Sequence, residues 1–575
     1  MNAHTLLTIA GHNPLATWTP LWLLLGGFVA VVVALTVMGR RDAPTFLTRV
    51  PNGLERVTGV PGWAAAMVGT ALYGLLVAGV GFYNDVAWHV AIGRDKKLFT
   101  APHTMIVAGL GFIALAAVIG IVYATLTEAE VGIRVGPLRV PWSAIPLGVL
   151  GFTALGGFPL DDLWHAHYGV DVTMWSPTHL LMILGASLSP IAAWLALGEA
   201  GVKPTDSAWA RVLHTLTAVL VLAGLTSVLG EFEFGVPQFQ QLYHPVLICL
   251  AAGIALVASR LVLGPGNAVL VGGLAAASRV LNTPSHVVQT RAAALFIAPA
   301  VAVELAALLF GVTRRLRFAV ASGVGIATIG LAGEYVWNRH AHQPWTPNLM
   351  LPAVLIGGLV AIGAALLASA LAGGVRRDGP GVPRWAVALG GLAVLVGLVL
   401  PLPRHAGNVQ AAIHVVGQGD TAVVHVTLTP ANAAAHARWF QTIAWQGGGM
   451  VVAEMHREGP GRYVSDKPVP VTGHWKTLVR LHTGDQMMSA PVWMPADPAI
   501  GKPQIPAVDR TIAFSHEQKY LTREARSGPA AFAVFAYTLL TIVAVLWATA
   551  FVLAARTRRV HKAIRAGRRP VAVTT

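Results

Sequence analysis

The sequence contains almost no cysteine and little charge. Its 575 residues include one cysteine, Cys249, inside an apolar run, which excludes an internal disulfide and any CxxC metal or redox site. A metal site in this chain must therefore use His, Met or carboxylate ligands. Only 11% of the residues are charged, whereas 55% are hydrophobic. This composition is typical of a membrane protein with several spans and not of a water-soluble domain.

The charge that is present is mainly basic, with a formal net charge of +15. A basic chain can bind nucleic acid, but here Arg and Lys gather in short loops and in the C-terminal stretch 555–569. The positive-inside rule expects this distribution of cytoplasmic segments. We therefore expect the lipid bilayer, and not nucleic acid, as the partner of this chain.

The apolar runs predict α-helical membrane spans. One further stretch, 267–281, is short and rich in Gly and Ala, and by itself fits either a re-entrant segment or a span. The clear spans are 17–39, 62–84, 103–126, 142–160, 177–198, 208–230, 245–263, 291–311, 318–337, 348–373, 383–402 and 529–555.

Arginine clusters decide how the stretch 267–281 is counted. The pairs at 40–41, 314–315 and 376–377, together with the C-terminal tail, all belong in the cytoplasm under the positive-inside rule. Only thirteen spans, with the N-terminus outside, place every cluster there. The sequence therefore predicts a multi-pass cell-membrane protein with an outer N-terminus and a cytoplasmic tail.

Residues 403–527 break the pattern of long apolar runs. Polar and apolar residues alternate in short stretches such as "TAVVHVTLT" and "HWKTLVRLH", which are separated by turn sequences rich in glycine. This alternation is typical of antiparallel strands in a small β-sandwich. We expect a transmembrane helical domain over 1–402, an extracytoplasmic β-sandwich domain over 403–527, and a C-terminal membrane anchor with a basic cytoplasmic tail over 528–575.

Two stretches near the N-terminal spans repeat one polar motif. "NDVAWHVAIGRDKKLFTAPH" (84–103) and "LDDLWHAHYGVDVTMWSPTH" (160–179) share the spacing Asp-x3-His-x13-His. Residues four apart share a helix face, and the Pro at the start of the next helix brings the last His back toward them. Such a set suits a divalent first-row metal, although a polar cap on a helical hairpin is an alternative. The candidate ligands are Asp85, His89 and His103, and Asp161, His165 and His179.

Weaker candidates follow the same logic of a carboxylate with His beyond it, or of Met beside His. For the helical ones the alternative is an interfacial polar network. In the β-domain, thioether plus imidazole favours Cu(I), while core packing of Met, or a docking module, is the alternative. These candidates are Glu231, His244, Glu334, His340 and His342 between spans, and Met455, His456, His482, Met487 and Met488 in the β-domain.

The stretch 85–103 resembles the signature of the C subunit of the copper membrane monooxygenases, the particulate methane and ammonia monooxygenases. The resemblance implies copper bound by Asp85, His89 and His103. Arg94, Asp95, Phe99 and Thr100 match the surrounding pattern. Because the first hairpin matches better than the second, it is expected to hold metal more tightly. The stretch 461–481 is similar to small periplasmic copper-handling domains.

Together these features lead to three functional expectations. The first is a copper-binding membrane protein related to that C subunit and belonging to an oxygen-dependent oxidation system, with other membrane subunits or a periplasmic copper donor as partners. The second is a copper transport or metal-delivery protein. The third is a proton-coupled transporter in which Asp-His pairs relay protons without a metal. Whether the chain is itself an enzyme is left open by the sequence.

Overall fold

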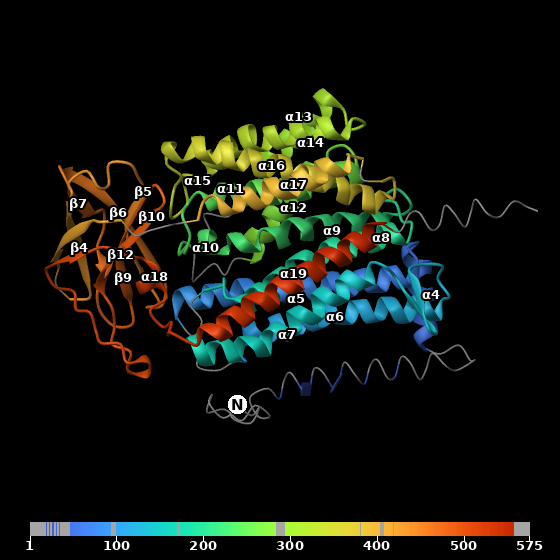
Figure 1. Cartoon of the computed structure of the whole chain (residues 1–575), viewed down its shortest axis with the longest axis horizontal. Helices are drawn as coiled ribbons and strands as arrows, with labels where there is room; N and C mark the ends of the chain where they lie inside the picture. Colours follow the sequence, from blue (N-terminus) through green and yellow to red (C-terminus); the bar gives the residue numbers. More distant parts are fainter. Residues whose placement is uncertain are drawn as a thin grey trace, which may run out of the picture.

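In the computed structural model, a bundle of long helices carries a mostly-β domain at one end (Figure 1). The structure describes residues 46–93, 99–169, 173–282, 294–379, 381–402, 407–417 and 419–556, with a few scattered positions between 19 and 34. Most of the predicted first span, 17–39, and the positions Arg94 and Asp95 lie outside the described residues.

Within the described part of the chain, nine helical segments are long and apolar enough to cross a membrane, which confirms the expected membrane class. Long apolar segments form helices here because a backbone in lipid must satisfy its hydrogen bonds within the segment. The segments are α5 (Gly62–Ala91), α6 (Ala101–Leu126), α7 (Ala144–Tyr168), α8 (Pro177–Glu199), α9 (Ala208–Leu225) extended through α10 (Gly230–Glu233), α11 (Tyr243–Leu263), α14 (Arg315–Gly325) continuing into α15 (Leu331–Asn338), α16 (Pro347–Arg376) and α19 (Ala530–Arg556).

Shorter helices complete the bundle, and among the described residues every predicted span from 62 onward overlaps a helix. The total of thirteen crossings stays a prediction. Two helices continue beyond the ends of their apolar spans, α5 past 84 and α7 past 160, so that Asp85 with His89 and Asp161 with His165 lie on helices as the spacing predicts. Hydropathy drops at the motifs, but the helical hydrogen bonds do not stop there. The shorter helices are α4 (Phe46–Thr58), α12 (Asn267–Asn282), α13 (Ile297–Phe310) and α17 (Arg384–Val399).

Small residues allow α5 and α6 to pack closely. A Cβ atom at Gly109 would lie 2.5 Å from the carbonyl oxygen of Gly74, and one at Gly81 would lie 2.9 Å from that of Pro102. Contacts this short leave room only for glycine. The close approach holds the end of α5 directly against the start of α6, where the repeated motif places its polar residues.

The C-terminal domain is built on one antiparallel ten-stranded sheet that runs in the order β11-β3-β4-β7-β6-β5-β9-β10-β12, with β8 paired to β4. Strands from both halves of this order contribute to one apolar core, so this single sheet curves around its core and is not divided into the two sheets of the expected sandwich. The strands are β3 (Gln410–Val416), β4 (Thr421–Thr429), β5 (Ala437–Trp445), β6 (Met450–Gly459), β7 (Arg462–Ser465), β8 (Val469–Pro470), β9 (Lys476–Thr483), β10 (Gln486–Trp493), β11 (Arg510–Ala513) and β12 (Ser515–His516).

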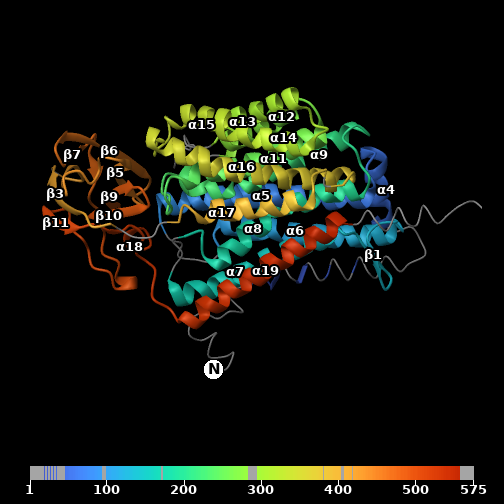
Figure 2. The ribbon, with the colours of Figure 1, turned by 45° about the horizontal axis from the view of Figure 1, so that its top comes forward.

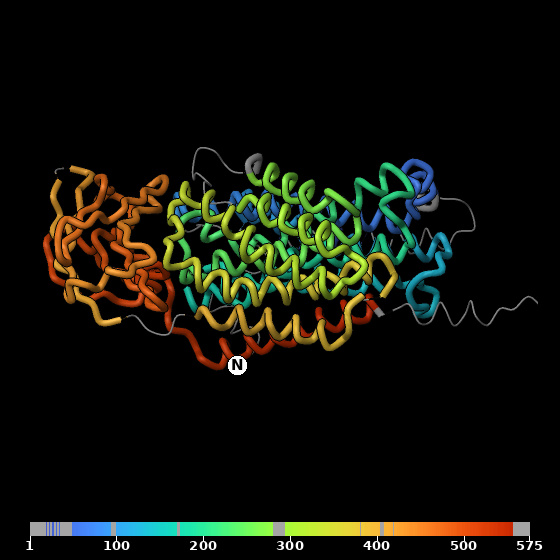
Figure 3. Tube along the Cα trace, turned by 90° about the horizontal axis from the view of Figure 1, so that it is seen from above, coloured from blue at the N-terminus to red at the C-terminus, as the bar shows by residue number. Residues whose placement is uncertain are grey.

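The β-domain is bound to the helix ends that carry the repeated motif. The backbone N–H of Gln446 donates to the carbonyl of Val90 (3.0 Å), and that of Gly448 donates to Ala91 (2.8 Å). The backbone N–H of Arg526 donates to Tyr168 at the end of α7 (2.7 Å). Figures 2 and 3 show the domain against this end of the bundle, with α19 running along the other helices. The domain therefore covers the end of the bundle at which both motifs lie.

A buried charged group helps to hold this joint. Nε of Arg480 donates to Oε2 of Glu517 (2.8 Å), and its NH2 group donates to the carbonyl of Pro237 in the helical domain (2.6 Å). Nε2 of His482 lies 2.7 Å from the same Glu517 oxygen. Burial alone would raise the pKa of Glu517, but Arg480 and His482 outweigh it and bring the pKa to about 2. Burial lowers the pKa of His482.

This group predicts that acid weakens the β-domain. An unfolded Glu titrates near about 4.3 and an unfolded His near about 6.5. Both folded pKa values are lower, so the unfolded chain binds protons at higher pH than the folded chain does. The contribution of these two groups to the stability of the β-domain is therefore complete at neutral pH. The His482 contribution declines as the pH falls below about 6.5, and the Glu517 contribution is lost between about pH 4.3 and about pH 2. Hydrogen exchange of the β9 amides, corrected for intrinsic rates, measures this.

The variant Glu517→Gln tests the same group at constant pH. It leaves the Arg480 cation buried without a counter-charge, which costs about 3–5 kcal/mol in comparable sites. Exchange of the β9 amides should rise at pH 7 in the variant. Protection equal to that of the unchanged protein would contradict the prediction.

Candidate metal centres

The two helical hairpins, α5-α6 and α7-α8, are built in the same way at their polar ends. Thr100 is the N-cap of α6, and its side chain accepts a hydrogen bond from the backbone N–H of His103 (3.3 Å). Ser176 is the N-cap of α8 and accepts from His179 (3.1 Å). A proline follows each cap within the first turn. Each cap thereby fixes a histidine in the first turn of the second helix.

In the first hairpin, one carboxylate faces two imidazoles. Oδ1 of Asp85 lies 3.0 Å from Nε2 of His103 and 3.7 Å from Nε2 of His89. Asp85 and His89 are four residues apart on α5 and share one helix face. Oδ1 of Asp85 is buried, and the two ring nitrogens are its close polar neighbours.

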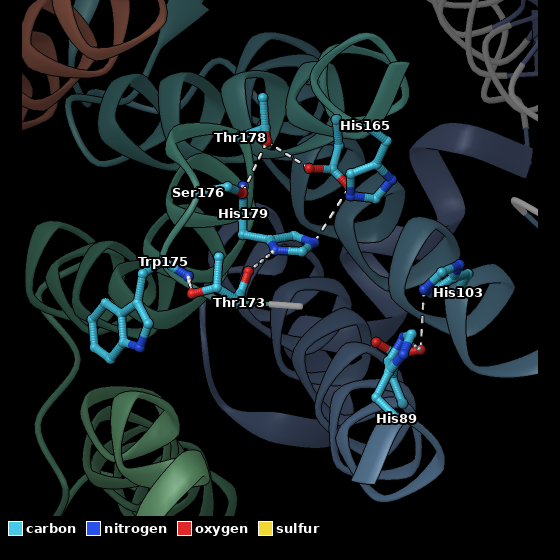
Figure 4. A network of polar contacts seen from close by, with 10 residues as sticks. His89, His103, His165, Thr173, Trp175, Ser176, Thr178 and His179 are labelled. Atoms are coloured by element: carbon cyan, nitrogen blue, oxygen red, sulfur yellow. Dashed lines mark hydrogen bonds and ion pairs between the residues drawn. The ribbon is translucent and has the colours of Figure 1, made fainter. Parts of the chain in front are cut away.

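In the second hairpin, the same three positions come together; Figure 4 shows His165 and His179 directed toward each other, with Thr178 beside them. Oδ2 of Asp161 lies 3.3 Å from Nε2 of His179 and 3.4 Å from Nε2 of His165. Further contacts orient these groups: the hydroxyl of Thr178 donates to Oδ1 of Asp161 (2.5 Å), and Nδ1 of His179 lies 2.9 Å from the carbonyl of Thr173. Such outer contacts fix the tautomer and the direction of a ligand.

Both groups fit a first-row transition metal. In each, one carboxylate oxygen and two imidazole nitrogens lie within 4.8 Å of one another, and no other such group of His, Cys, Asp and Glu occurs among the described residues. Ligand atoms on one tetrahedral ion, with bonds of about 2.0–2.1 Å, are separated by about 3.3 Å. The measured carboxylate-imidazole distances of 3.0–3.7 Å match this spacing. Two nitrogens and one oxygen suit Cu, Zn or Fe better than Mg or Ca.

The two groups line one cavity of about 1170 Å³. Phe158 stands between them: it lies three residues before Asp161 on α7, and its ring is 6.0 Å from that of His103 in an edge-on contact. Trp445 and Gln446 of the β-domain line the same cavity. Gln446 also donates through its side chain to the carbonyl of His89 (3.1 Å). The β-domain therefore forms part of the wall beside the first group.

The weaker helical candidates have other partners. Glu231 accepts from the backbone N–H of Gln238, and Glu334 accepts from the N–H groups of Leu295 and Phe296 at the start of α13. The ring of His244 stacks on Phe232, and its Nδ1 accepts from Trp345. His340 is exposed, and the carbonyl of His342 accepts from Gln441 of the β-domain. The structure brings none of the five into a group of three metal-ligand side chains within the described residues.

The Met and His candidates of the β-domain are distributed over two faces. Met487 pairs with His482 across β9 and β10, whereas the adjacent Met488 pairs with Leu481 and belongs to the apolar core. Successive strand residues point to opposite faces, so Met487, Met488 and His482 do not surround one ion. Met455 also lies in the core, and His456 is exposed.

The helical domain contains a buried ion pair that the sequence analysis does not predict. Arg279 of α12 forms a salt bridge with Glu233, and the hydroxyl of Tyr83 donates to the same carboxylate (3.3 Å). Arg279 and Tyr83 both line the large cavity. The only sequence signal was an arginine in an apolar stretch, since its partner lies 46 residues away.

No protein-family model, curated protein or solved structure gives a significant match to this chain. The resemblance to the monooxygenase C subunit is confined to residues 85–103.

Proposed function

We propose that this chain is a copper-binding integral membrane protein, related to the C subunit of the copper membrane monooxygenases, that works in an oxygen-dependent oxidation system. The observation that carries the proposal is the duplicated arrangement of one carboxylate and two imidazoles around a common centre. A second support is that both groups face a cavity large enough for an organic molecule. Metal-ligand groups beside such a cavity are typical of metalloenzymes and their subunits.

The choice of copper rests on ligand chemistry and on the resemblance. Imidazole with carboxylate binds Cu, Zn and Fe, and among divalent ions copper has the highest intrinsic affinity for such sites. Bound copper would supply one-electron redox chemistry at the cavity wall. The chain's own groups would hold and orient the ion: His89 and His103 come from two helices, and Thr178 and Thr173 orient Asp161 and His179 of the second group.

The proposal includes the orientation in the membrane. The β-domain and both metal groups lie at one end of the bundle, so all three must be on the same side of the membrane. The arginine clusters assign that end to the outer side, with thirteen spans and a cytoplasmic tail. An outer copper donor and other membrane subunits are then the partners that the sites would meet.

Two other functions compete with this one. Copper delivery by the β-domain is weakened because Met487 and Met488 lie on opposite faces of their strand. A proton relay needs only the Asp-His contacts of 3.0–3.7 Å and no metal. Metal content separates the relay from the copper proposal, and oxygen consumption by the copper-loaded protein separates oxidation from transport.

The first prediction here concerns metal stoichiometry. His103→Ala should lower bound copper by about one ion per chain, and His179→Ala should do the same at the second site, because the remaining two ligands cannot complete a coordination shell. His167→Ala is the matched control, since Nδ1 of His167 lies 2.8 Å from the carbonyl of Leu163 and the ring packs against Phe532. Elemental analysis of the purified proteins measures the content. Full copper in both ligand variants would rule out these sites.

The second prediction is that the second site holds copper more tightly than the first, opposite to the order that the resemblance implies. Asp161 is only 5% exposed. Its Oδ1 atom, which does not face the imidazoles, accepts a hydrogen bond from Thr178. Loss of such an outer contact typically costs about 10–100-fold in metal affinity. Thr178→Val should therefore weaken the second site by about that factor in a chelator competition. Thr178→Ser keeps the hydroxyl and should leave the copper affinity of the second site unchanged. Equal losses of affinity in both variants would point to a packing effect.

The third prediction tests sidedness. Cys249 is buried, so in a Cys249→Ala background a single new cysteine reports its own position. Lys467→Cys in the β-domain should react with an impermeant maleimide in intact cells. Arg134→Cys, in the β1-β2 hairpin (Ile133–Val135 and Leu138–Val140), should react only after lysis. The reverse pattern would move the metal groups to the cytoplasmic side.

A further inference from the structure

The large cavity extends far beyond the two metal groups. Along α5, residues that line it occur in every turn of the stretch from Leu72 to His89, among them Leu76, Gly79 and Tyr83. One face of this helix therefore forms a continuous wall. At 1.5 Å per residue, the wall from Leu72 to His89 is about 25 Å long. The cavity is an elongated chamber that has the metal groups at one end.

The opposite wall is apolar as well. Leu216, Val219, Leu220 and Ala223 lie on one face of α9 and line the chamber, and Met182 of α8 adds to it. The ionisable side chains gather toward the other end, beside the metal groups and the β-domain. The chamber thus has a long hydrocarbon-like section and a short polar section. Its volume, about 1170 Å³, exceeds the range of about 300–1,000 Å³ of ordinary small-molecule sites.

The apolar section reaches the outer surface of the bundle within the membrane-spanning segments. Tyr73 and Leu76 of α5 line the chamber and yet are 55% and 54% exposed, and Leu216 of α9 is 46% exposed. These positions lie in the middle parts of their helices, where a spanning helix meets lipid chains and not water. A molecule that enters between them comes from the hydrocarbon layer of the bilayer.

We propose that the chamber binds a lipophilic molecule with a single long hydrocarbon chain, which enters sideways from the bilayer between α5 and α9. Its chain lies along Leu76, Gly79 and Leu220, and its end reaches the space beside Asp85 and Asp161. Binding follows from the shape and lining of the chamber alone. The assignment of this molecule as the substrate of the metal groups rests on the proposed function.

Gly79 offers a way to block the chamber without disturbing its walls. A Cβ atom added there meets no other atom within 4 Å, and the residue has ordinary helical backbone angles, so a larger side chain extends into open space. Gly79 lies six residues before Asp85, about 9 Å along the helix, and so does not touch the metal groups. Gly79→Trp should fill the chamber and leave the metal groups in place.

The matched control is Gly69→Trp on the same helix. A Cβ atom at Gly69 also meets nothing within 4 Å, but this residue does not line the chamber. The probe is a long-chain fatty alcohol that carries a photoreactive diazirine in mid-chain, applied to the full-length protein in nanodiscs. Peptide mapping then locates the labelled residues. A phosphatidylcholine with the same diazirine in one acyl chain, in a parallel sample, distinguishes a free single-chain molecule from a membrane lipid.

The fatty alcohol is expected to label α5 and α9 at chamber residues in the unchanged protein and in Gly69→Trp. Labelling in Gly79→Trp should fall about tenfold or more, which corresponds to a loss of about 1.4 kcal/mol in binding. Equal labelling in the two tryptophan variants, absence of chamber labelling, or chamber labelling by the phospholipid alone would each overturn the proposal.

Copper content, measured on the same samples, keeps this test separate from the proposed function. A protein that takes the probe into the chamber but holds no copper would retain the lipophilic site and lose the metal proposal. Copper without chamber labelling would do the opposite. His103→Ala should label as the unchanged protein does, because the apolar walls and not the metal hold the hydrocarbon chain.

Discussion

The arrangement of the helical domain depends on two carboxylates held at the ends of apolar helices. An ionised carboxylate in such surroundings is costly unless it is paired. Asp85 and Asp161 are each paired with two imidazoles, one from the same helix and one from the next. The second imidazole reaches its place only because a capped helix start and close glycine packing bring the two helices together. Caps, prolines and glycines of both hairpins thus serve one electrostatic requirement.

The contacts within a hairpin could be predicted from the sequence because they are local in the chain. The i, i+4 spacing and the position of the next helix start determine that Asp161 meets His165 and His179. Contacts between distant segments could not be predicted this way. Glu334 looked like another carboxylate at a helix exit, but it accepts hydrogen bonds from the backbone at Leu295 and Phe296, which no local pattern shows. The apolar spans end at 84 and 160 because hydropathy falls where the polar motif begins, but the i, i+4 spacing already indicates that the helices continue through Asp85 and Asp161.

In the β-domain, the composition indicates a copper site that the geometry of the strands does not form. Met and His close together in sequence indicate Cu(I) chemistry, but strand alternation sends Met488 into the core and leaves Met487 beside His482 on the face toward the helical domain. Alternation itself can be predicted from sequence. Which face meets the core and which meets the helices depends on the contact between the domains, such as that of Arg480 with Pro237, and that contact has no sequence signature.

The contacts of the β-domain with the helix ends give this domain a structural role that requires no metal binding. Gln446 and Gly448 donate to the last carbonyls of α5, groups that would otherwise need water at the helix end. Gln446 and Trp445 also line the polar end of the chamber, next to the two Asp-His-His groups. Because the same strand end satisfies the helix terminus and forms part of the chamber wall, loosening of the domain at low pH would act directly on the group of Asp85, His89 and His103.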